Sequence, residues 1–239
     1  MKHKLSIWLI ILLTIPLLSF VLQSGSHQIK LKQNVRVLKN GKKIENISEV
    51  FYDYSKGTMI MHQTEPFEHY LYTDAKGEIK IYYPEKNEVY LSRDPNKITD
   101  QSILFYFFSN RLYDFGIRDM GFTVSKTEIK DKYVVTWWKA PNESMPIKQI
   151  EIVHDADLPI YMAYYNHNDE IIQKNYYYDY NKKGEVPVQV PQKILEISYI
   201  SPKDSIITQT ISTDIKYGLE ASSKISQFKI PLNAKIIRN

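Results

Sequence analysis

The sequence predicts an α+β chain dominated by a long antiparallel β meander of about twelve strands, interrupted by one strong helix. Three observations support this prediction. Short runs rich in Tyr, Ile and Val recur along the chain, and these residue types fit a pleated sheet. Turn-forming residues separate the runs at short intervals. Strands and helices do not alternate regularly, which argues against a parallel α/β sheet.

The N-terminal residues 1–26 have the pattern of an export signal. A positive start at residues 2–4 precedes an almost continuous apolar run from Leu5 to Leu22, and small residues follow at 24–26. This order favours a cleaved signal peptide. An uncleaved membrane anchor is the alternative, because a run of about 18 apolar residues is near the minimum for spanning a bilayer. In both cases we expect one exported domain over residues 27–239.

The first part of that domain mixes weak and strong signals. Residues 27–45 are basic and weakly patterned, and we interpret them as a short helix or an irregular lead-in. Extended patterns then cover residues 44–54 and 58–64. Residues 66–93 form three short strands, and their turns lie at 74–77 and 84–87, where Gly, Asn and Pro favour reversal of the chain.

A helix is predicted over residues 101–113. Pro95 ends the preceding sheet, and Thr99 or Asp100 can cap a helix by accepting hydrogen bonds from free backbone N–H groups. The apolar residues that follow have the spacing of one helical face. These residues are Ile103, Leu104, Phe107, Phe108 and Leu112.

The rest of the chain returns to strands. Seven are predicted, at about residues 122–129, 132–139, 147–154, 159–165, 170–179, 192–200 and 205–215. The alternation is clear at Ile150 and Ile152, which share one face while Gln149 and Glu151 share the other. Such a pattern is typical of a sheet with one covered face and one wetter face.

Composition and motifs argue against several classes of function. The formal net charge is only +4 and the basic residues are scattered, so we expect no nucleic-acid binding. Without cysteine the chain has no disulfide, thiolate metal site or Cys nucleophile. No G-x-S-x-G, phosphate loop or H-E-x-x-H occurs, and the S-x-x-K at Ser226–Lys229 is interpreted as a chance match in a terminal strand.

We therefore expect a non-enzymatic protein that needs no cofactor and no metal. Two acidic clusters, at residues 154–157 and 166–169, could in principle take a hard cation. Their Asn and Asp residues are explained equally well by turn chemistry. An enzyme with an unrecognised site remains the other alternative.

Four stretches occur in an order that is characteristic of one family. They are the strand pair from Phe51 to Phe67, the passage from Gly77 to Tyr90, the acidic corner within residues 150–172, and the closing passage 186–231. Over roughly residues 44–235 the chain resembles the outer-membrane lipoprotein carriers of the bacterial periplasm, with their LolA-like and LolB-like fold.

The resemblance implies an unclosed antiparallel half-barrel of about eleven or twelve strands over residues 27–239. One or two helices would cover its concave face as a lid, and residues 101–113 are a candidate lid. The implied function is periplasmic binding or transport of lipid or lipoprotein acyl chains by a monomer, with a possible inner- or outer-membrane protein partner. The alternative is an envelope protein-interaction or sensor module on the same fold that regulates a membrane partner.

One position departs from the family pattern. The carriers have an arginine beside the proline of the early strand pair, and it holds the lid shut by hydrogen bonds. Here Glu65 precedes Pro66, and the arginine is absent. This departure favours a relative with the same barrel whose cargo and lid mechanism can differ.

The candidate ligand-binding residues are apolar or aromatic residues at alternate strand positions, together with the apolar face of the helix. They are Tyr70, Tyr72, Ile81, Tyr83, Ile103, Phe107, Phe108, Trp137, Ile150, Ile152, Met162 and Tyr164. Ordinary core packing beneath a helix would give the same pattern, so both interpretations stay open. A shift of one residue in any strand would also move its candidates to the other face.

Overall fold

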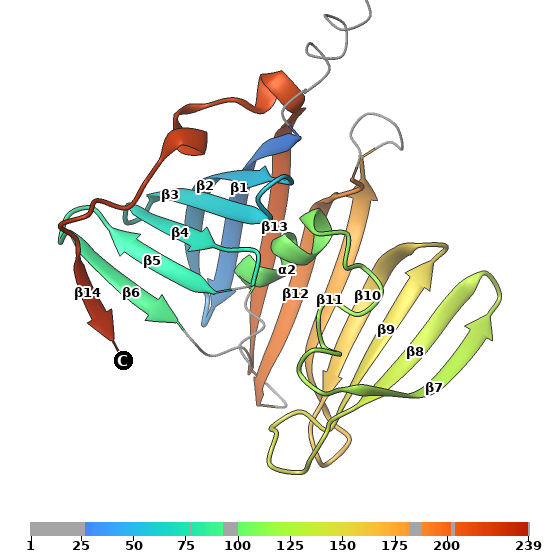
Figure 1. Cartoon of the computed structure of the whole chain (residues 1–239). Coiled ribbons are helices and arrows are strands. Elements are labelled where there is room, and N and C mark those ends of the chain that lie inside the picture. The colour runs from blue at the N-terminus through green and yellow to red at the C-terminus, as the bar shows by residue number, and fades with distance from the viewer. Residues whose placement is uncertain (1–26, 77, 93–99, 182–187, 202–203, 239) are drawn as a thin grey trace, which may run out of the picture.

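A computed structural model describes residues 27–76, 78–92, 100–181, 188–201 and 204–238. These residues form one 14-stranded sheet that curves without closing (Figure 1). Its order is β14-β6-β5-β4-β3-β2-β1-β13-β12-β11-β10-β9-β8-β7. The predicted fold class is confirmed, with more strands than expected. The predicted signal or anchor at residues 1–26 lies outside the described residues.

The first half of the sheet follows chain order from its centre to one edge. Its strands are β1 (Gln28–Lys39), β2 (Lys42–Asp53), β3 (Thr58–Glu65), β4 (His69–Thr73), β5 (Ile79–Tyr83) and β6 (Glu88–Ser92). Each pairs antiparallel with the next. Short connections between consecutive strands make this half a simple meander.

The second half runs from the other edge back to the centre. Its strands are β7 (Thr123–Lys130), β8 (Tyr133–Lys139), β9 (Gln149–Asp155), β10 (Leu158–Tyr165), β11 (Ile171–Tyr180), β12 (Pro191–Ser201) and β13 (Asp204–Tyr217). These bounds lie close to the seven predicted strands. The two halves join where β13 pairs antiparallel with β1.

The prediction of a helix or irregular lead-in at residues 27–45 is wrong. Residues 28–39 form β1, and residues from Lys42 onward begin β2. Asn40 and Gly41 connect them with φ values of 51° and 70°, as a two-residue hairpin turn of this type requires. The strand forms despite its many basic residues because Ile29 and Leu31 are fully buried at the centre of the sheet.

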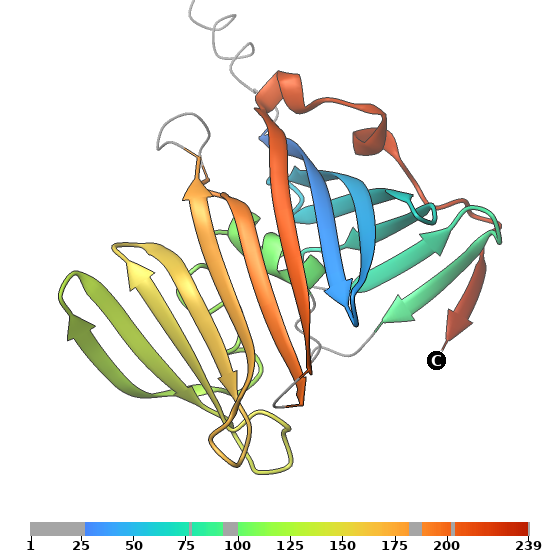
Figure 2. The same cartoon turned by 180° about the vertical axis from the view of Figure 1, so that it is seen from behind.

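Helix α2 (Asp100–Phe108) lies across the concave face of the sheet (Figures 1 and 2). It is shorter than the predicted 101–113, because the chain turns out of the helix at Asn110, where φ is 55°. Leu112 is nevertheless buried after the helix has ended. Among the described residues, no helix is both long and apolar enough to span a membrane.

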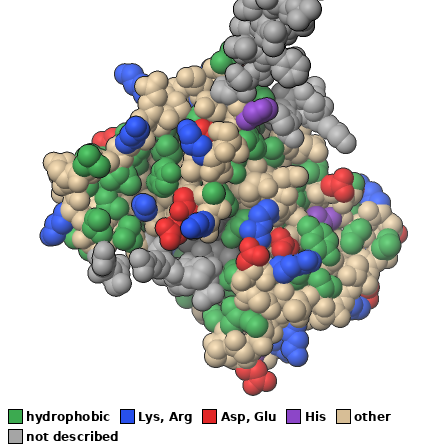
Figure 3. Space-filling view, viewed as in Figure 1, with side chains coloured by type: hydrophobic (Ala, Val, Ile, Leu, Met, Phe, Trp, Pro, Cys, Tyr) green, Lys and Arg blue, Asp and Glu red, His purple; other side chains and the backbone are tan. Residues whose placement is uncertain are grey.

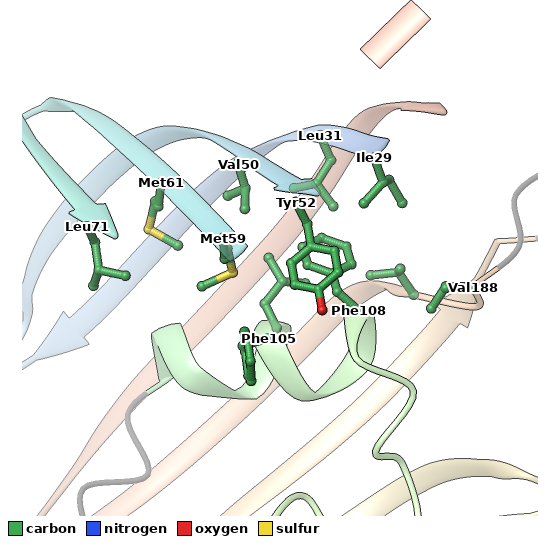
Figure 4. Packing of buried hydrophobic residues seen from close by; sticks show 12 residues of the cluster. Ile29, Leu31, Val50, Tyr52, Met59, Met61, Leu71, Phe105, Phe108 and Val188 are labelled. Carbon is green, nitrogen blue, oxygen red and sulfur yellow. The ribbon is translucent and has the colours of Figure 1, made fainter. Parts of the chain in front are cut away.

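The helix divides the concave face into two apolar clusters. The first core joins residues of β1 to β4 to Leu104, Phe105 and Phe108 of α2. The second core joins residues of β8 to β11 to Ile103 and Phe107. Hydrophobic side chains also gather over β4 to β6 (Figure 3). Figure 4 shows Met59, Tyr52 and their neighbours directed from the sheet toward the helix.

The C-terminal arm, residues 218–238, packs on the convex face. It contains the 3-10 turns η1 (Gly218–Ala221) and η2 (Lys224–Gln227) and the strand β14 (Lys235–Arg238). Ile225 of the arm packs against Phe51 and Ile60, which point away from α2. Strand β14 then pairs parallel with β6 and covers that edge of the sheet.

Two expectations at the C-terminus need correction. Ser226–Lys229 was expected in a terminal strand, but it starts in η2 and continues into the irregular chain that follows. The Ser226 hydroxyl donates a 2.6 Å hydrogen bond to the Ser223 carbonyl, so it stabilises this turn. Strand β14 was not predicted, because a four-residue edge strand has too short a pattern to recognise.

Candidate functional site

The structure places nine of the twelve candidate residues on the concave face. Six of them belong to the second core, namely Ile103, Phe107, Ile150, Ile152, Met162 and Tyr164. Ile81 and Phe108 belong to the first core. Tyr83 packs beside His69 and Tyr90 near the β6 edge. Most of these side chains are buried in contact with α2, as core packing predicts, and their contact with a ligand stays a prediction.

Tyr70 and Tyr72 lie on the convex face, opposite to the face expected for a cavity. Tyr70 pairs across the sheet with Tyr82, whereas Leu71 pairs with Ile81 and points to the first core. Tyr70 instead stacks on Phe228 of the C-terminal arm, with ring centroids 3.7 Å apart. The sequence could not give this result, because the register of the β4–β5 hairpin decides which tyrosines share a face with Ile81.

Trp137 also lies on the convex face, where Lys126 approaches its ring to 4.8 Å. The neighbouring Trp138 occupies the second core and is fully buried. Its indole N–H donates a 3.0 Å hydrogen bond to the Thr136 hydroxyl. The two indoles therefore lie on opposite sides of β8, and the inward one is Trp138 rather than the predicted Trp137.

A pocket of about 320 Å³ opens on the concave face beside the N-terminal half of α2. Strands from both halves of the sheet build it, so it forms only because β13 pairs with β1. Its apolar lining residues are Val35, Val37, Met61, Ile103, Leu104 and Ile194. Its polar lining residues are Gln33, Asn46, Ser48, Gln63, Glu196, Thr208 and Thr210.

Ile103 is the only one of the twelve candidates that lines this pocket. The polar lining residues are not among the candidates because all the candidates are apolar or aromatic, and Val35 and Val37 lie in a segment for which no strand is predicted. One signal could have found them: Gln33, Val35 and Val37 alternate with Asn34 and Arg36, so they share one face of an extended segment. The basic residues of segment 27–45 mask this alternation, so the pattern predicts a short helix or an irregular lead-in there.

The pocket combines a mostly apolar surface with amide, hydroxyl and carboxylate groups. Among the described lining residues only Glu196 is charged, and its carboxylate accepts a 3.0 Å hydrogen bond from the Ser198 hydroxyl. His69 pairs with the lining residue Gln63, and burial lowers the pKa of its imidazole below the usual value. His69 is therefore neutral near pH 7, and it adds no positive charge to this side of the pocket.

The two acidic clusters make contacts that fit turn chemistry. The Asn166 side-chain oxygen accepts hydrogen bonds from the backbone N–H groups of Asn168 and Glu170, at 2.9 and 3.0 Å. His154 donates through Nε2 to the Leu112 carbonyl at 3.0 Å and is buried. Within the described residues, no group of three or more His, Asp or Glu side chains is placed to hold a metal ion.

Glu65, which the resemblance to the carriers sets at the position of their arginine, is exposed at the end of β3. Helix α2 is held by apolar packing: five of its residues from 103 to 108 are buried in the two cores. The contacts of α2 residues 103–108 with the sheet are thus hydrophobic and aromatic, as illustrated by Phe108, which stacks on Tyr52 at 5.3 Å.

Comparison with known proteins finds solved structures of similar architecture. No family model matches the chain, and no curated protein matches it. A LolA superfamily protein from Nitrosomonas europaea superposes with a TM-score of 0.55 at 10% identity, over 80% of this chain and 86% of that chain. A putative outer membrane lipoprotein-sorting protein domain from Vibrio parahaemolyticus gives 0.58 at 10% identity, over 89% and 94%.

A third similar structure is a DUF1329 family protein from Desulfovibrio piger, with a TM-score of 0.53 at 12% identity, over 86% of this chain and 91% of that chain. Each match spans at least 80% of this chain and at least 86% of the other chain. The chain therefore has the LolA-like fold that its sequence pattern indicated.

Proposed function

We propose that this protein is an exported, non-enzymatic binding or carrier protein for lipid or lipoprotein acyl chains. The observation that carries the proposal is the pocket of about 320 Å³ on the concave face beside α2. The LolA-like fold supports it, because the similar structures include a putative lipoprotein-sorting domain. Cleavage within residues 1–26 would release the domain as a periplasmic monomer.

The physical basis of binding would be burial of apolar chain. Transfer of each methylene from water contributes about 0.8 kcal/mol, so about eight methylenes would contribute roughly 6 kcal/mol before the costs of association. Val35, Val37 and Met61 offer the apolar surface for this contact inside the pocket. A membrane protein partner that competes for the same chain would complete the transfer.

An envelope protein-interaction or sensor module is the second candidate, and a different surface favours it. Tyr161, Tyr176, Tyr178 and Tyr199 lie on the convex face of β10 to β12, and the last two are exposed. Tyr161 and Tyr176 pack with ring centroids 5.1 Å apart. Exposed aromatic surfaces of this kind are typical of protein interfaces.

Binding of a fluorescent acyl probe to the purified protein tests the proposal, together with mass spectrometry of any lipid that co-purifies. Asn46 is a half-buried lining residue, so Asn46→Trp would fill the pocket from its rim. The matched control is Ile47→Trp, because Ile47 is the next residue of β2 and is exposed.

We expect saturable probe binding that Asn46→Trp weakens at least tenfold and that Ile47→Trp leaves unchanged. Absence of both bound lipid and probe binding would refute the carrier proposal and favour the interaction module. Probe binding that resists Asn46→Trp would place the lipid site elsewhere on the molecule.

A further inference from the structure

A row of buried polar side chains crosses the concave face at the inner side of the pocket. Gln63 of β3 pairs with Ser48 of β2, Ser48 pairs with Gln33 of β1, and Gln33 pairs with Ser212 of β13. We call these four residues the polar row. They come from segments up to 179 positions apart in the chain, and the sheet register alone brings them together.

The polar row is buried but poorly satisfied by the protein. The exposed fractions are 9% for Gln63, 5% for Ser48, 6% for Gln33 and 2% for Ser212. Within the described part of the chain, no hydrogen bond is found for the side chains of Gln33, Ser48 or Gln63, and the Ser212 hydroxyl has no partner. Only the Ser212 hydroxyl is fully enclosed, whereas Gln33, Ser48 and Gln63 line the pocket. A ligand that covered one of these groups without pairing with it would cost about 1–3 kcal/mol.

Three of these four residues line the pocket, so their free groups are available to a ligand. Asn46, Thr208 and Thr210 add further amide and hydroxyl groups to the same lining. Each amide or hydroxyl can both donate and accept hydrogen bonds. The best partner for such a set is a group that does the same, which means another hydroxyl or amide.

The charges of the lining residues further restrict the class of head group that the pocket can bind. A buried phosphate or carboxylate needs a cation beside it, and none of the described lining residues is Lys, Arg or His. The charged residue among them is Glu196, whose carboxylate accepts a hydrogen bond from the Ser198 hydroxyl and can accept another from a hydroxyl of a ligand. Lys39 and Lys42 flank the turn between β1 and β2 and do not line the pocket. Each lies two residues closer to the turn than the Val37–Ile44 pair.

We propose that the pocket selects amphiphiles by an uncharged head group that bears hydroxyls or amides, and that the polar row is the recognition element. This inference rests on the proposed lipid-binding function of the same pocket. Such a site discriminates strongly, because a ligand without the matching groups leaves the buried amides unpaired.

The test uses three probes that share a twelve-carbon chain and differ in head group, each below its critical micelle concentration. They are monolauroylglycerol, dodecyl phosphate and dodecyltrimethylammonium. Affinity is measured by displacement of a fluorescent acyl probe from the wild type and from Gln33→Leu. The matched control is Gln209→Leu, since Gln209 lies between Thr208 and Thr210 on β13 but is exposed on the opposite face.

We expect the wild type to bind monolauroylglycerol at least tenfold more tightly than dodecyl phosphate. Gln33→Leu should lower the affinity for monolauroylglycerol about tenfold, which corresponds to the loss of one good hydrogen bond. It should leave binding of dodecyl phosphate unchanged, and Gln209→Leu should change nothing. Thermal melting of each variant checks the fold, and Thr208→Val, which conserves volume, repeats the test if Gln33→Leu unfolds.

Two results would overturn the inference while the lipid-binding function stands. One is equal or tighter binding of dodecyl phosphate or dodecyltrimethylammonium. The other is an unchanged affinity of Gln33→Leu for monolauroylglycerol, which would mean that water satisfies the polar row. Absence of binding by all three probes would instead refute the proposed function itself, and this inference with it.

Discussion

Phe107 offers the most direct test of how α2 is attached to the sheet. Its side chain is 0% exposed in the second core. The ring lies 5.4 Å from that of Phe115 and 5.5 Å from that of Tyr177, both in edge-on geometry. If α2 is an integral part of the core, truncation of this ring must lower the free energy of unfolding of the whole domain.

The size of the effect follows from burial. Truncation of a fully buried Phe to Ala costs about 3–5 kcal/mol, which combines lost transfer free energy with the cavity left behind. Each lost edge-on aromatic contact adds about 0.5–1.5 kcal/mol, so we expect the cost of Phe107→Ala to lie toward the upper end of that range. A domain typically has only 5–15 kcal/mol of stability, so the variant should unfold at a much lower urea concentration.

The assay is urea unfolding followed by Tyr and Trp fluorescence, with native-state hydrogen exchange of the α2 amides. Phe67→Ala is the matched control, because Phe67 is 72% exposed and should cost less than about 0.5 kcal/mol. A loss below about 1 kcal/mol for Phe107→Ala would refute the reasoning. The reasoning would also be refuted if the α2 amides exchanged through an opening whose free energy is far below the global free energy of unfolding, because the helix would then be a detachable lid.

Three further predictions concern single side chains. Trp138→Ala should lower the free energy of unfolding by about 3–5 kcal/mol, whereas Trp137→Ala on the convex face should cost about 1 kcal/mol, and urea midpoints will separate them. Burial lowers the pKa of His154 below the usual value of 6.5, so the unfolded chain takes up the proton more readily than the folded one. The contribution of His154 to the free energy of unfolding is therefore complete above about pH 6.5, and it falls as the pH drops toward the folded pKa. His154→Gln should flatten the fall in urea midpoint between pH 7 and 5. An unchanged pH profile of the variant would contradict this. Phe228→Ala removes the ring that stacks on Tyr70 at 3.7 Å, so limited proteolysis should cut the C-terminal arm faster while the sheet stays intact. Equal cleavage rates in variant and wild type would show that the arm is held by other contacts.

The strands of the second half were predicted well because their signal is local. Turn residues such as those at 130–132 and 155–157 separate runs with clear alternation, and β7 to β13 lie close to the expected ranges. The helix was found for the same reason, since Ile103, Phe107 and their neighbours repeat at helical spacing. Its end was misplaced because Leu112 continues the apolar spacing after the backbone has turned at Asn110.

The errors in the candidate site all concern pairing between strands. Tyr70 and Tyr72 were assigned to the face of Ile81, and the β4–β5 register puts them on the other face. Trp137 was assigned inward, whereas its neighbour Trp138 is the buried one. Alternation shows that two residues of one strand share a face, but it does not show which face the core covers.

The sequence by itself determined an antiparallel meander, one apolar helix and the order of the elements, because turn chemistry and side-chain periodicity act over a few residues. Only the tertiary structure decided which side chains meet in the pocket. Gln33 and Gln63 lie beside Thr208 and Thr210 because β1 pairs with β13, a contact across most of the chain. Such pairing depends on burial of the whole concave face against α2, and no local pattern encodes it.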